Sequence, residues 1–114
     1  MNAVEPLIKH AVDVELTAAR RDHGEFNSLH EACAVIFEEF EEARTELNCA
    51  NFALDRMWHD NARRDNTIGL NEMIDAIESH AINLAIEAVQ MAAMARKASA
   101  LAENEDCKTW FGKE

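Results

Sequence analysis

The chain has 114 residues, enough for one domain with a modest hydrophobic core. Its formal net charge is −11, from 22 acidic and 11 basic residues, so we expect neither nucleic acid nor an anionic membrane surface as a direct partner. Apolar residues make up 48% of the chain, with three glycines, one proline and no tyrosine, and this composition favours helices over strands.

The cysteines and the apolar segments bear on the compartment. Cys33, Cys49 and Cys107 are odd in number and form no CxxC pair, so we interpret them as free thiols in a reducing compartment. No N-terminal signal pattern is present. The apolar run of residues 81–95 is too short to span a bilayer and carries Glu87. We therefore expect a cytoplasmic protein.

The first two predicted helices are separated by a short connection that contains Gly24. Residues 3–21 carry an apolar stripe at helical spacing, and Gly24 suits the end of a helix. Ser28 and Glu31 then form the S-x-x-E pattern of a capping box, which predicts the start of a second helix. We expect this helix to fade at residues 48–51. Its apolar seam, at alternating four- and three-residue spacing, consists of Leu29, Cys33, Ile36, Phe40, Ala43 and Leu47.

Two further helices are predicted in the second half of the chain. A short helix at about residues 51–63 is followed by a loop rich in Asn, Asp and Arg that ends at Gly69. A long helix then runs from about residue 70 to 102, and the acidic tail of residues 103–114 is either flexible or docked through its two aromatic residues. The seam of the long helix consists of Leu70, Ile74, Ile77, Ala81, Leu84, Ala88, Met91 and Ala95.

These elements predict an all-α fold, an antiparallel helical bundle of about four helices in a single domain over residues 1–114. The last helix has more apolar surface than three short partners can cover. Ile82, Ile86, Val89 and Ala93 form a stripe off its main seam. A second copy of the chain is the natural cover for that stripe, so we expect a homo-oligomer, either a dimer or a tetramer.

One polar stripe crosses the apolar last helix. Asn83, Glu87 and Gln90 are the only polar residues between positions 81 and 95, and their spacing places them on one side of a helix. A carboxylate in such a helix needs hydrogen bonds, a proton or a metal ion. This stripe is therefore where we expect the chemistry of the protein.

Four oxygen-bearing side chains have the spacing of a metal site. Glu39 and Glu42 lie three residues apart beside the seam of the second helix, and Glu87 and Gln90 repeat that spacing in the last helix. If the two seams pack together, these groups converge into a site suited to Mg²⁺ or Mn²⁺. The pattern leaves a structural alternative open, in which the glutamates form a solvated face and Glu87 pairs with an arginine or a histidine.

Other catalytic centres lack their sequence patterns. No glutamate is followed by a histidine three residues later, as a carboxylate-bridged di-iron bundle requires. His30 and Glu31 lack the second histidine of a zinc protease motif, and the three glycines are too far apart for a phosphate loop. His80 lies one turn before Asn83 on the polar stripe, where we expect a hydrogen-bonded or exposed side chain rather than a ligand.

Two segments resemble MazG-like proteins, which are all-α nucleoside triphosphate pyrophosphohydrolases. The first reads GEFNSLHEA at residues 24–32 and continues into an EExxE motif at residues 38–42. The second, EAVQMAAMA at residues 87–95, looks like the later signature of the small phage and prophage branch. In this family the EExxE helix and a later ExxD helix hold Mg²⁺ against the phosphates of a nucleotide. Water then attacks between the α and β phosphates and releases pyrophosphate and a nucleoside monophosphate.

The resemblance implies a set of site residues. Glu39, Glu42, Glu87 and Gln90 would be the metal ligands, and Glu38 would orient or deprotonate the attacking water. Gln90 stands where the family has an aspartate, so this position offers a carbonyl oxygen but no charge. Residues 49–66 look like an insertion between the two motifs.

The substrate site and the function follow from the same resemblance. We expect a nucleoside triphosphate as the partner, with its base held by Phe26, Asn27, His30 and Trp58. The alternative is a catalytically inactive MazG-like oligomer that binds a nucleotide or a protein, and the glutamine at position 90 favours it. A plain coiled-coil adaptor would explain the seams but neither Glu87 nor Gln90.

Overall fold

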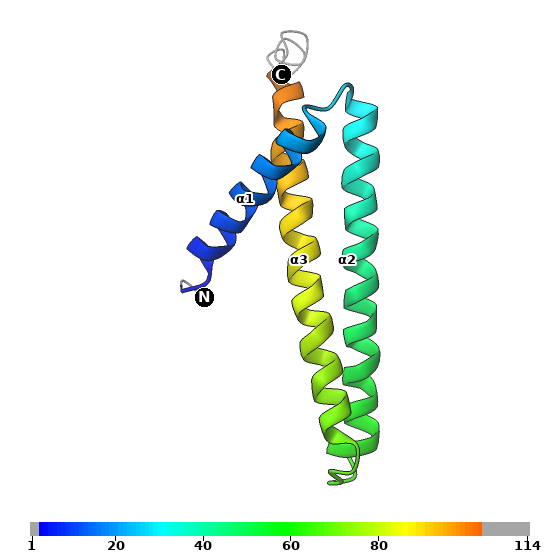
Figure 1. Ribbon diagram of the computed structural model, residues 1–114. Coiled ribbons are helices and arrows are strands. Elements are labelled where there is room, and N and C mark those ends of the chain that lie inside the picture. The colour runs from blue at the N-terminus through cyan, green and yellow to red at the C-terminus, as the bar shows by residue number, and fades with distance from the viewer. Residues whose placement is uncertain (1–2, 104–114) are drawn as a thin grey trace, which may run out of the picture. The chain divides into compact units, whose positions relative to one another are not determined.

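The computed structural model describes residues 3–103, and in this part of the chain every regular element is a helix. Three α-helices, α1 (Glu5–His23), α2 (Leu29–Met57) and α3 (Leu70–Ala102), are joined by short connections (Figure 1). A π-helical turn, η1 (Trp58–Ala62), follows α2 directly. The predicted all-α class is confirmed.

The sequence also led to predictions about the C-terminal tail and about membrane crossing. The predicted acidic tail, with Trp110 and Phe111, lies outside the described residues apart from its first position. Within residues 3–103, none of the helices combines the length and the apolar character that a membrane crossing requires.

The connection between α1 and α2 has the local structure that its residues predict. Gly24 adopts a φ of 69°, a left-handed conformation that favours glycine, and its N–H donates to the carbonyl of Arg20 at 2.9 Å. The N–H of Glu31 donates to Ser28 Oγ at 3.1 Å, and Glu31 Oε1 accepts the N–H of Asn27 at 2.8 Å. The predicted capping box is therefore present and fixes the start of α2.

The predicted break between a second and a third helix is wrong. α2 continues without interruption through residues 48–51 to Met57, so residues 3–103 contain three α-helices rather than about four. Asparagine is only mildly unfavourable within a helix, and tertiary contacts readily outweigh such a preference. Those contacts are visible on both sides of the predicted break, because Cys49 and Ala50 are half-buried and Ala53 is buried.

The described residues fall into two compact units. Unit 1 takes in the chain up to Glu39 together with the residues from Val89 onward, and unit 2 consists of Phe40–Ala88. α2 and α3 each contribute to both units. The single domain over residues 1–114 stays a prediction.

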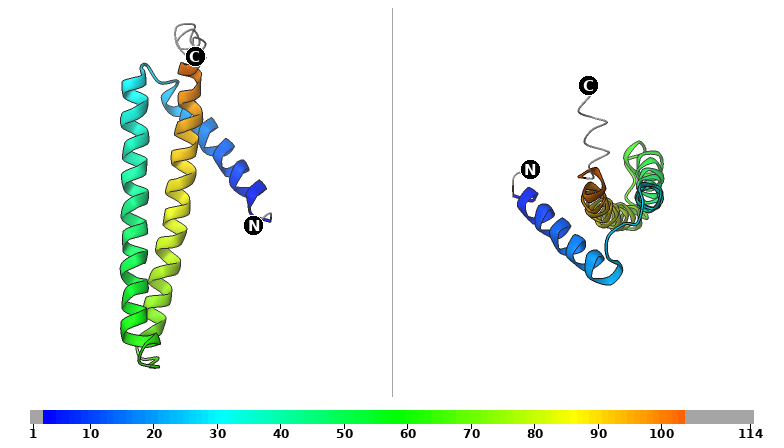
Figure 2. Two further views of the ribbon diagram at one scale, coloured as in Figure 1. Left: turned by 180° about the vertical axis from the view of Figure 1, so that it is seen from behind. Right: turned by 90° about the horizontal axis from the view of Figure 1, so that it is seen from above.

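Unit 1 has a small core between α1 and the C-terminal part of α3, which meet in both views of Figure 2. Val12 and Leu16 of α1 pack against Ala93 of α3. An ion pair between Asp13 and Arg96 joins the same two helices. The partly buried residues that complete this core are Val89, Ala92 and Met94.

Unit 2 is a helical hairpin in which α2 and α3 run antiparallel, as Figures 1 and 2 both show. Its buried apolar residues are two alanines, Ala43 and Ala53. The buried side chain of Asn61 closes the connection between the helices, because its Nδ2 donates to the carbonyls of Asn66 at 2.8 Å and Ile68 at 3.0 Å. Polar and small groups therefore form much of the interior of this hairpin.

The predicted apolar seams face the interior of the described chain only in part, since Ile36 of α2 and Ile77 and Leu84 of α3 are half-buried but other seam residues are exposed. Of the α2 seam, Leu29, Phe40 and Leu47 are exposed and Ala43 is buried. On α3 the predicted seam residues Ile74 and Ala81 are exposed as well. α3 is apolar on almost every side, so its periodicity does not define which side faces α2.

Over residues 81–88 the exposed side of α3 is apolar, and two of the three residues on its covered side are polar. Between positions 81 and 88, the half-buried residues are Asn83, Leu84 and Glu87. The exposed residues over the same stretch are all apolar: Ala81, Ile82, Ala85, Ile86 and Ala88. This distribution is the reverse of the usual one for a surface helix.

Candidate functional site

Two predicted metal ligands, Glu42 of α2 and Glu87 of α3, meet in unit 2, where Glu42 is exposed and Glu87 is half-buried. Each offers a carboxylate oxygen within 4.8 Å of the other. A hydrogen bond to Glu87 raises the pKa of Glu42 above its ordinary value, and the negative charge of Glu87 and desolvation act in the same direction. Two carboxyl groups can share a hydrogen bond only while a proton lies between them, which is why the contact favours the protonated form of Glu42.

Glu39 lies one turn before Glu42 on the same uninterrupted helix. Its side chain is half-buried, and one of its carboxylate oxygens lies within 4.8 Å of one from Glu42. Glu42 is thus the common neighbour of Glu39 along α2 and of Glu87 on α3. Carboxylate oxygens at such spacing are the donors that hard divalent cations prefer.

The other two residues of the predicted catalytic set are placed differently. Glu38 is exposed, as its position on α2 predicted. Gln90 is half-buried in unit 1, where it lines a pocket together with Glu39. The glutamine at this position therefore belongs to the wall of a pocket that the sequence did not reveal.

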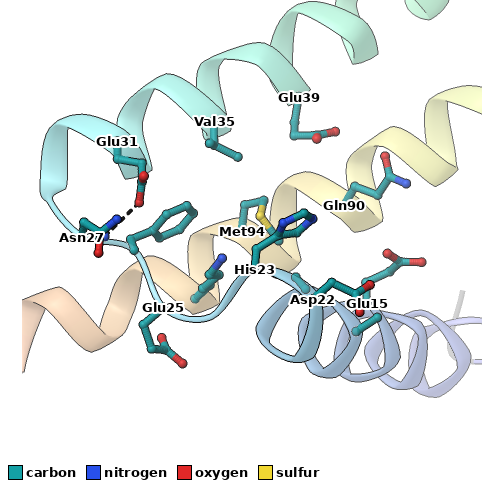
Figure 3. Close-up of a pocket in the computed structure, with 14 residues that line it drawn as sticks. Glu15, Asp22, His23, Glu25, Asn27, Glu31, Val35, Glu39, Gln90 and Met94 are labelled. Carbon is teal, nitrogen blue, oxygen red and sulfur yellow. Dashed lines mark hydrogen bonds between the residues drawn. The ribbon is translucent and has the colours of Figure 1, made fainter.

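The pocket of unit 1 has a volume of about 520 Å³. α1, the connection before α2, the first turns of α2 and the C-terminal part of α3 all contribute side chains to it (Figure 3). Its apolar walls include Phe26, Val35 and Met94. Its charged and polar lining consists of Glu15, Asp22, His23, Glu25, Asn27, Glu31, Glu39, Gln90 and Lys97.

Several carboxylates in this lining interact with neighbouring groups, among them Asp22, Glu25 and Glu31. Arg21 Nε lies 3.0 Å from Asp22 Oδ1, and this hydrogen bond and the charge of Arg21 lower the pKa of Asp22. Glu25 pairs with the Nε of Arg20 at 2.7 Å. Glu31 accepts the backbone N–H that belongs to the capping box. The charge of the pocket is therefore less negative than its number of acids suggests.

Lys97 is a pocket residue that the sequence interpretation missed. Its side chain is only 4% exposed, and its Nζ lies 4.2 Å from the centre of the Phe26 ring, a cation–π contact. The sequence did contain a signal for this residue. Lys97 is a charged residue that comes shortly after the apolar run of residues 81–95, just as Glu87 is a charged residue within that run. The interpretation applied this criterion to the acid and not to the lysine.

The predicted substrate-binding residues divide into two groups. Phe26 and Asn27 line the pocket of unit 1, and Phe26 is buried. His30 is exposed on the first turn of α2 and is not part of the lining. Trp58 belongs to η1 in unit 2 and is 55% exposed. The structure thus brings the first pair, but not His30, to the pocket.

His80 is hydrogen-bonded, as the sequence interpretation expected. Its Nδ1 lies 2.7 Å from Glu46 Oε2, and both side chains are partly buried between α2 and α3 in unit 2. This contact provides a second polar link across the hairpin, in addition to the carboxyl pair of Glu42 and Glu87.

Comparison of the chain with models of known protein families, with curated proteins and with solved structures finds no match. The resemblance to MazG-like proteins therefore rests on the two sequence segments alone.

Proposed function

We propose that this protein hydrolyses a nucleoside triphosphate to a nucleoside monophosphate and pyrophosphate in a reaction that depends on Mg²⁺ or Mn²⁺. The observation that supports this most directly is the contact between Glu42 and Glu87. These acids come from the two segments that resemble the EExxE and ExxD helices of MazG-like enzymes. A function that needs both helices at one cation requires such a contact.

The residues available at this contact fit a divalent cation. Glu39, Glu42 and Glu87 would hold Mg²⁺ through carboxylate oxygens, and the bound ion would replace the proton that Glu42 and Glu87 otherwise share. When bound, such an ion neutralises triphosphate charge and polarises the attacked phosphorus. Gln90 would add a neutral carbonyl oxygen, and Glu38, which is exposed to water, would orient or deprotonate the nucleophile.

The second candidate function is a binding module without catalysis. Gln90 favours it, because a glutamine supplies no charge where the family has an aspartate. In that case the pocket of unit 1 would still hold a nucleotide, and the carboxyl pair would be a structural hydrogen bond within the hairpin.

The assembly and the compartment complete the proposal. A second copy would cover the exposed apolar side of α3, which carries Ile82 and Ile86, and would make the protein a homo-oligomer. The three cysteines of the sequence fit a reducing environment such as the cytoplasm, and the two described ones, Cys33 and Cys49, are free thiols.

Pyrophosphate release by the purified full-length chain tests the enzymatic proposal. With millimolar Mg²⁺, at least one common ribo- or deoxynucleoside triphosphate should be hydrolysed. Glu87→Ala should lower kcat/KM by roughly 100-fold or more, as expected when a group that supports transition-state charge is removed. Glu78→Ala is the matched control, because Glu78 is an exposed glutamate on the same helix.

The assay also separates the two candidate functions. Absence of turnover across all eight common nucleotides, with Mg²⁺ and with Mn²⁺, would contradict the enzymatic proposal. If a nucleotide then still raised the melting temperature, the binding module would be supported, since a ligand of the native state stabilises it.

A further inference from the structure

The pocket of unit 1 combines a buried cation with flat apolar walls. Lys97 is only 4% exposed, and its Nζ lies 4.2 Å from the centre of the Phe26 ring. An ammonium group has three N–H donors, and one face of an aromatic ring does not accept all of them. No buried side-chain nitrogen or oxygen among the described residues lacks a hydrogen-bond partner, so the ammonium group still reaches solvent, and a ligand oxygen in the pocket would accept from it in place of water.

The remaining lining indicates what kind of oxygen this is. Carboxylates of Glu15, Glu31 and Glu39 face the same cavity, so a free phosphate or carboxylate beside Lys97 would be repelled. A neutral, planar group that carries both a carbonyl oxygen and N–H donors satisfies the lysine and the acids together. Phe26, Val35 and Met94 provide apolar contacts for the faces of such a group.

We infer that this pocket binds a guanine base, with Lys97 donating to its O6 and N7 and a pocket carboxylate accepting from its N1–H and N2 amino group. Lysine contacts to O6 and N7 are among the commonest specific contacts to guanine. Adenine presents the reverse arrangement, with an amino group in place of O6 and an unprotonated nitrogen in place of N1–H. It would therefore place a donor against Lys97 and an acceptor against the acid.

The pocket lies within unit 1, and all of the residues that line it belong to that unit. The identity of the ligand as a nucleotide comes from the proposed function, on which this inference rests.

The first test compares substrates. The wild-type protein should favour GTP or dGTP over the adenine nucleotide by about tenfold or more in kcat/KM, as one bidentate base contact typically provides. Lys97→Met, which keeps an unbranched stem against Phe26, should bring this ratio towards one. Lys9→Met removes an exposed lysine that pairs with Glu5 and should leave the ratio unchanged.

The second test needs neither metal nor catalysis. Guanosine added to the full chain with methyl-labelled methionine should shift the NMR signal of Met94, which lines the pocket, and adenosine should shift it much less. The Met94→Leu variant assigns the signal. In Lys97→Met the guanosine shift should be lost while the melting curve shows a folded protein.

The outcomes distinguish this inference from the proposed function. If nucleotides are hydrolysed with equal efficiency for guanine and adenine, or if Lys97→Met leaves the preference intact, the base assignment is wrong and the proposed function stands. If nothing is hydrolysed but guanosine binds in a manner that depends on Lys97, the inference stands and the enzymatic proposal falls. If guanosine leaves Met94 unaffected, the inference is overturned.

Discussion

The two units of this protein differ in the size of the apolar side chains that they bury. Unit 1 buries Leu16 and Phe26 and leaves charged groups around a pocket. In unit 2 the buried apolar residues are alanines, Ile77 and Leu84 are half-buried, and the exposed larger residues include Phe40, Leu47, Phe52, Leu54, Ile74, Ile82 and Ile86. Unit 1 therefore has a small core of larger side chains, whereas the fully buried apolar residues of unit 2 are small.

This difference distinguishes the side of α3 that contacts α2 in unit 2 from the side that is exposed. The side of α3 that faces α2 in unit 2 carries Glu87 and His80, each in contact with an acid of α2. Polar groups at this contact stabilise a hairpin less than packed aliphatic groups would. A hairpin of this composition gains more free energy of folding by covering its outer surface than by its inner contacts.

The largest expected effect comes from placing charge on that outer surface. Ile82→Glu combined with Ile86→Glu should convert the proposed homo-oligomer into a monomer, because both side chains are about half-exposed on the apolar side of α3. Light scattering coupled to size-exclusion chromatography measures the mass. Asn71→Glu combined with Ser79→Glu is the control, since it adds the same charge at exposed polar positions of α3. A wild-type protein that is already monomeric would refute the role given to this surface.

A smaller effect distinguishes the cores of the two units. Leu16→Ala should lower the free energy of unfolding by about 2–5 kcal/mol, the usual loss for a buried leucine. Leu54→Ala, at a position 51% exposed in unit 2, should change it by less than about 0.5 kcal/mol. Denaturant unfolding at a concentration where the chain is monomeric measures both. Equal losses for the two variants would remove the contrast between the units.

The smallest expected effect is the pH dependence of the carboxyl pair. The raised pKa of Glu42 means that its stabilising contribution is full below the ordinary carboxyl pKa and is lost as the pH rises through the raised value. Glu42→Gln keeps a hydrogen-bond donor at every pH, so without divalent cations it should melt above the wild type at pH 7. This advantage should vanish below about pH 4.

Melting curves in chelator between pH 4 and pH 8 measure this difference. Glu38→Gln serves as the control, because Glu38 is exposed on the same helix. A Glu42→Gln variant that melts below the wild type at pH 7 would show that Glu42 and Glu87 do not share a proton. Added Mg²⁺ should reduce the advantage of the variant if the ion binds the wild-type carboxylates.

Much of the fold was predictable because local signals agreed. Gly24, the Ser28 and Glu31 capping box and the length of the last helix all indicated elements that the structure contains. The continuity of α2 was not predictable, since asparagines at positions 48 and 51 weaken a helix locally while burial of Ala53 supports it.

The orientation of the helices could not be predicted for a related reason. A helix that is apolar on nearly all sides has no dominant periodicity, so the sequence named Ile74 and Ala81 as the contact residues where the structure uses Met73 and His80. Glu87 was identified because a carboxylate in an apolar helix is informative whichever side it faces, and Glu42 was identified from its position beside the predicted seam and from the EExxE motif. Lys97 lies close to the same apolar run and was equally informative. A basic residue in or beside an apolar helix should therefore be considered as a site residue in the same way as an acidic one.

The two units are formed from different numbers of chain segments, and this has a consequence for the order of folding. Unit 2 is one continuous stretch, Phe40–Ala88, whereas unit 1 combines both ends of the chain. The pair of Asp13 and Arg96 joins positions 83 residues apart. Closing so long a loop is entropically unfavourable unless the hairpin has already brought its ends together, so we expect hairpin formation to precede docking of α1.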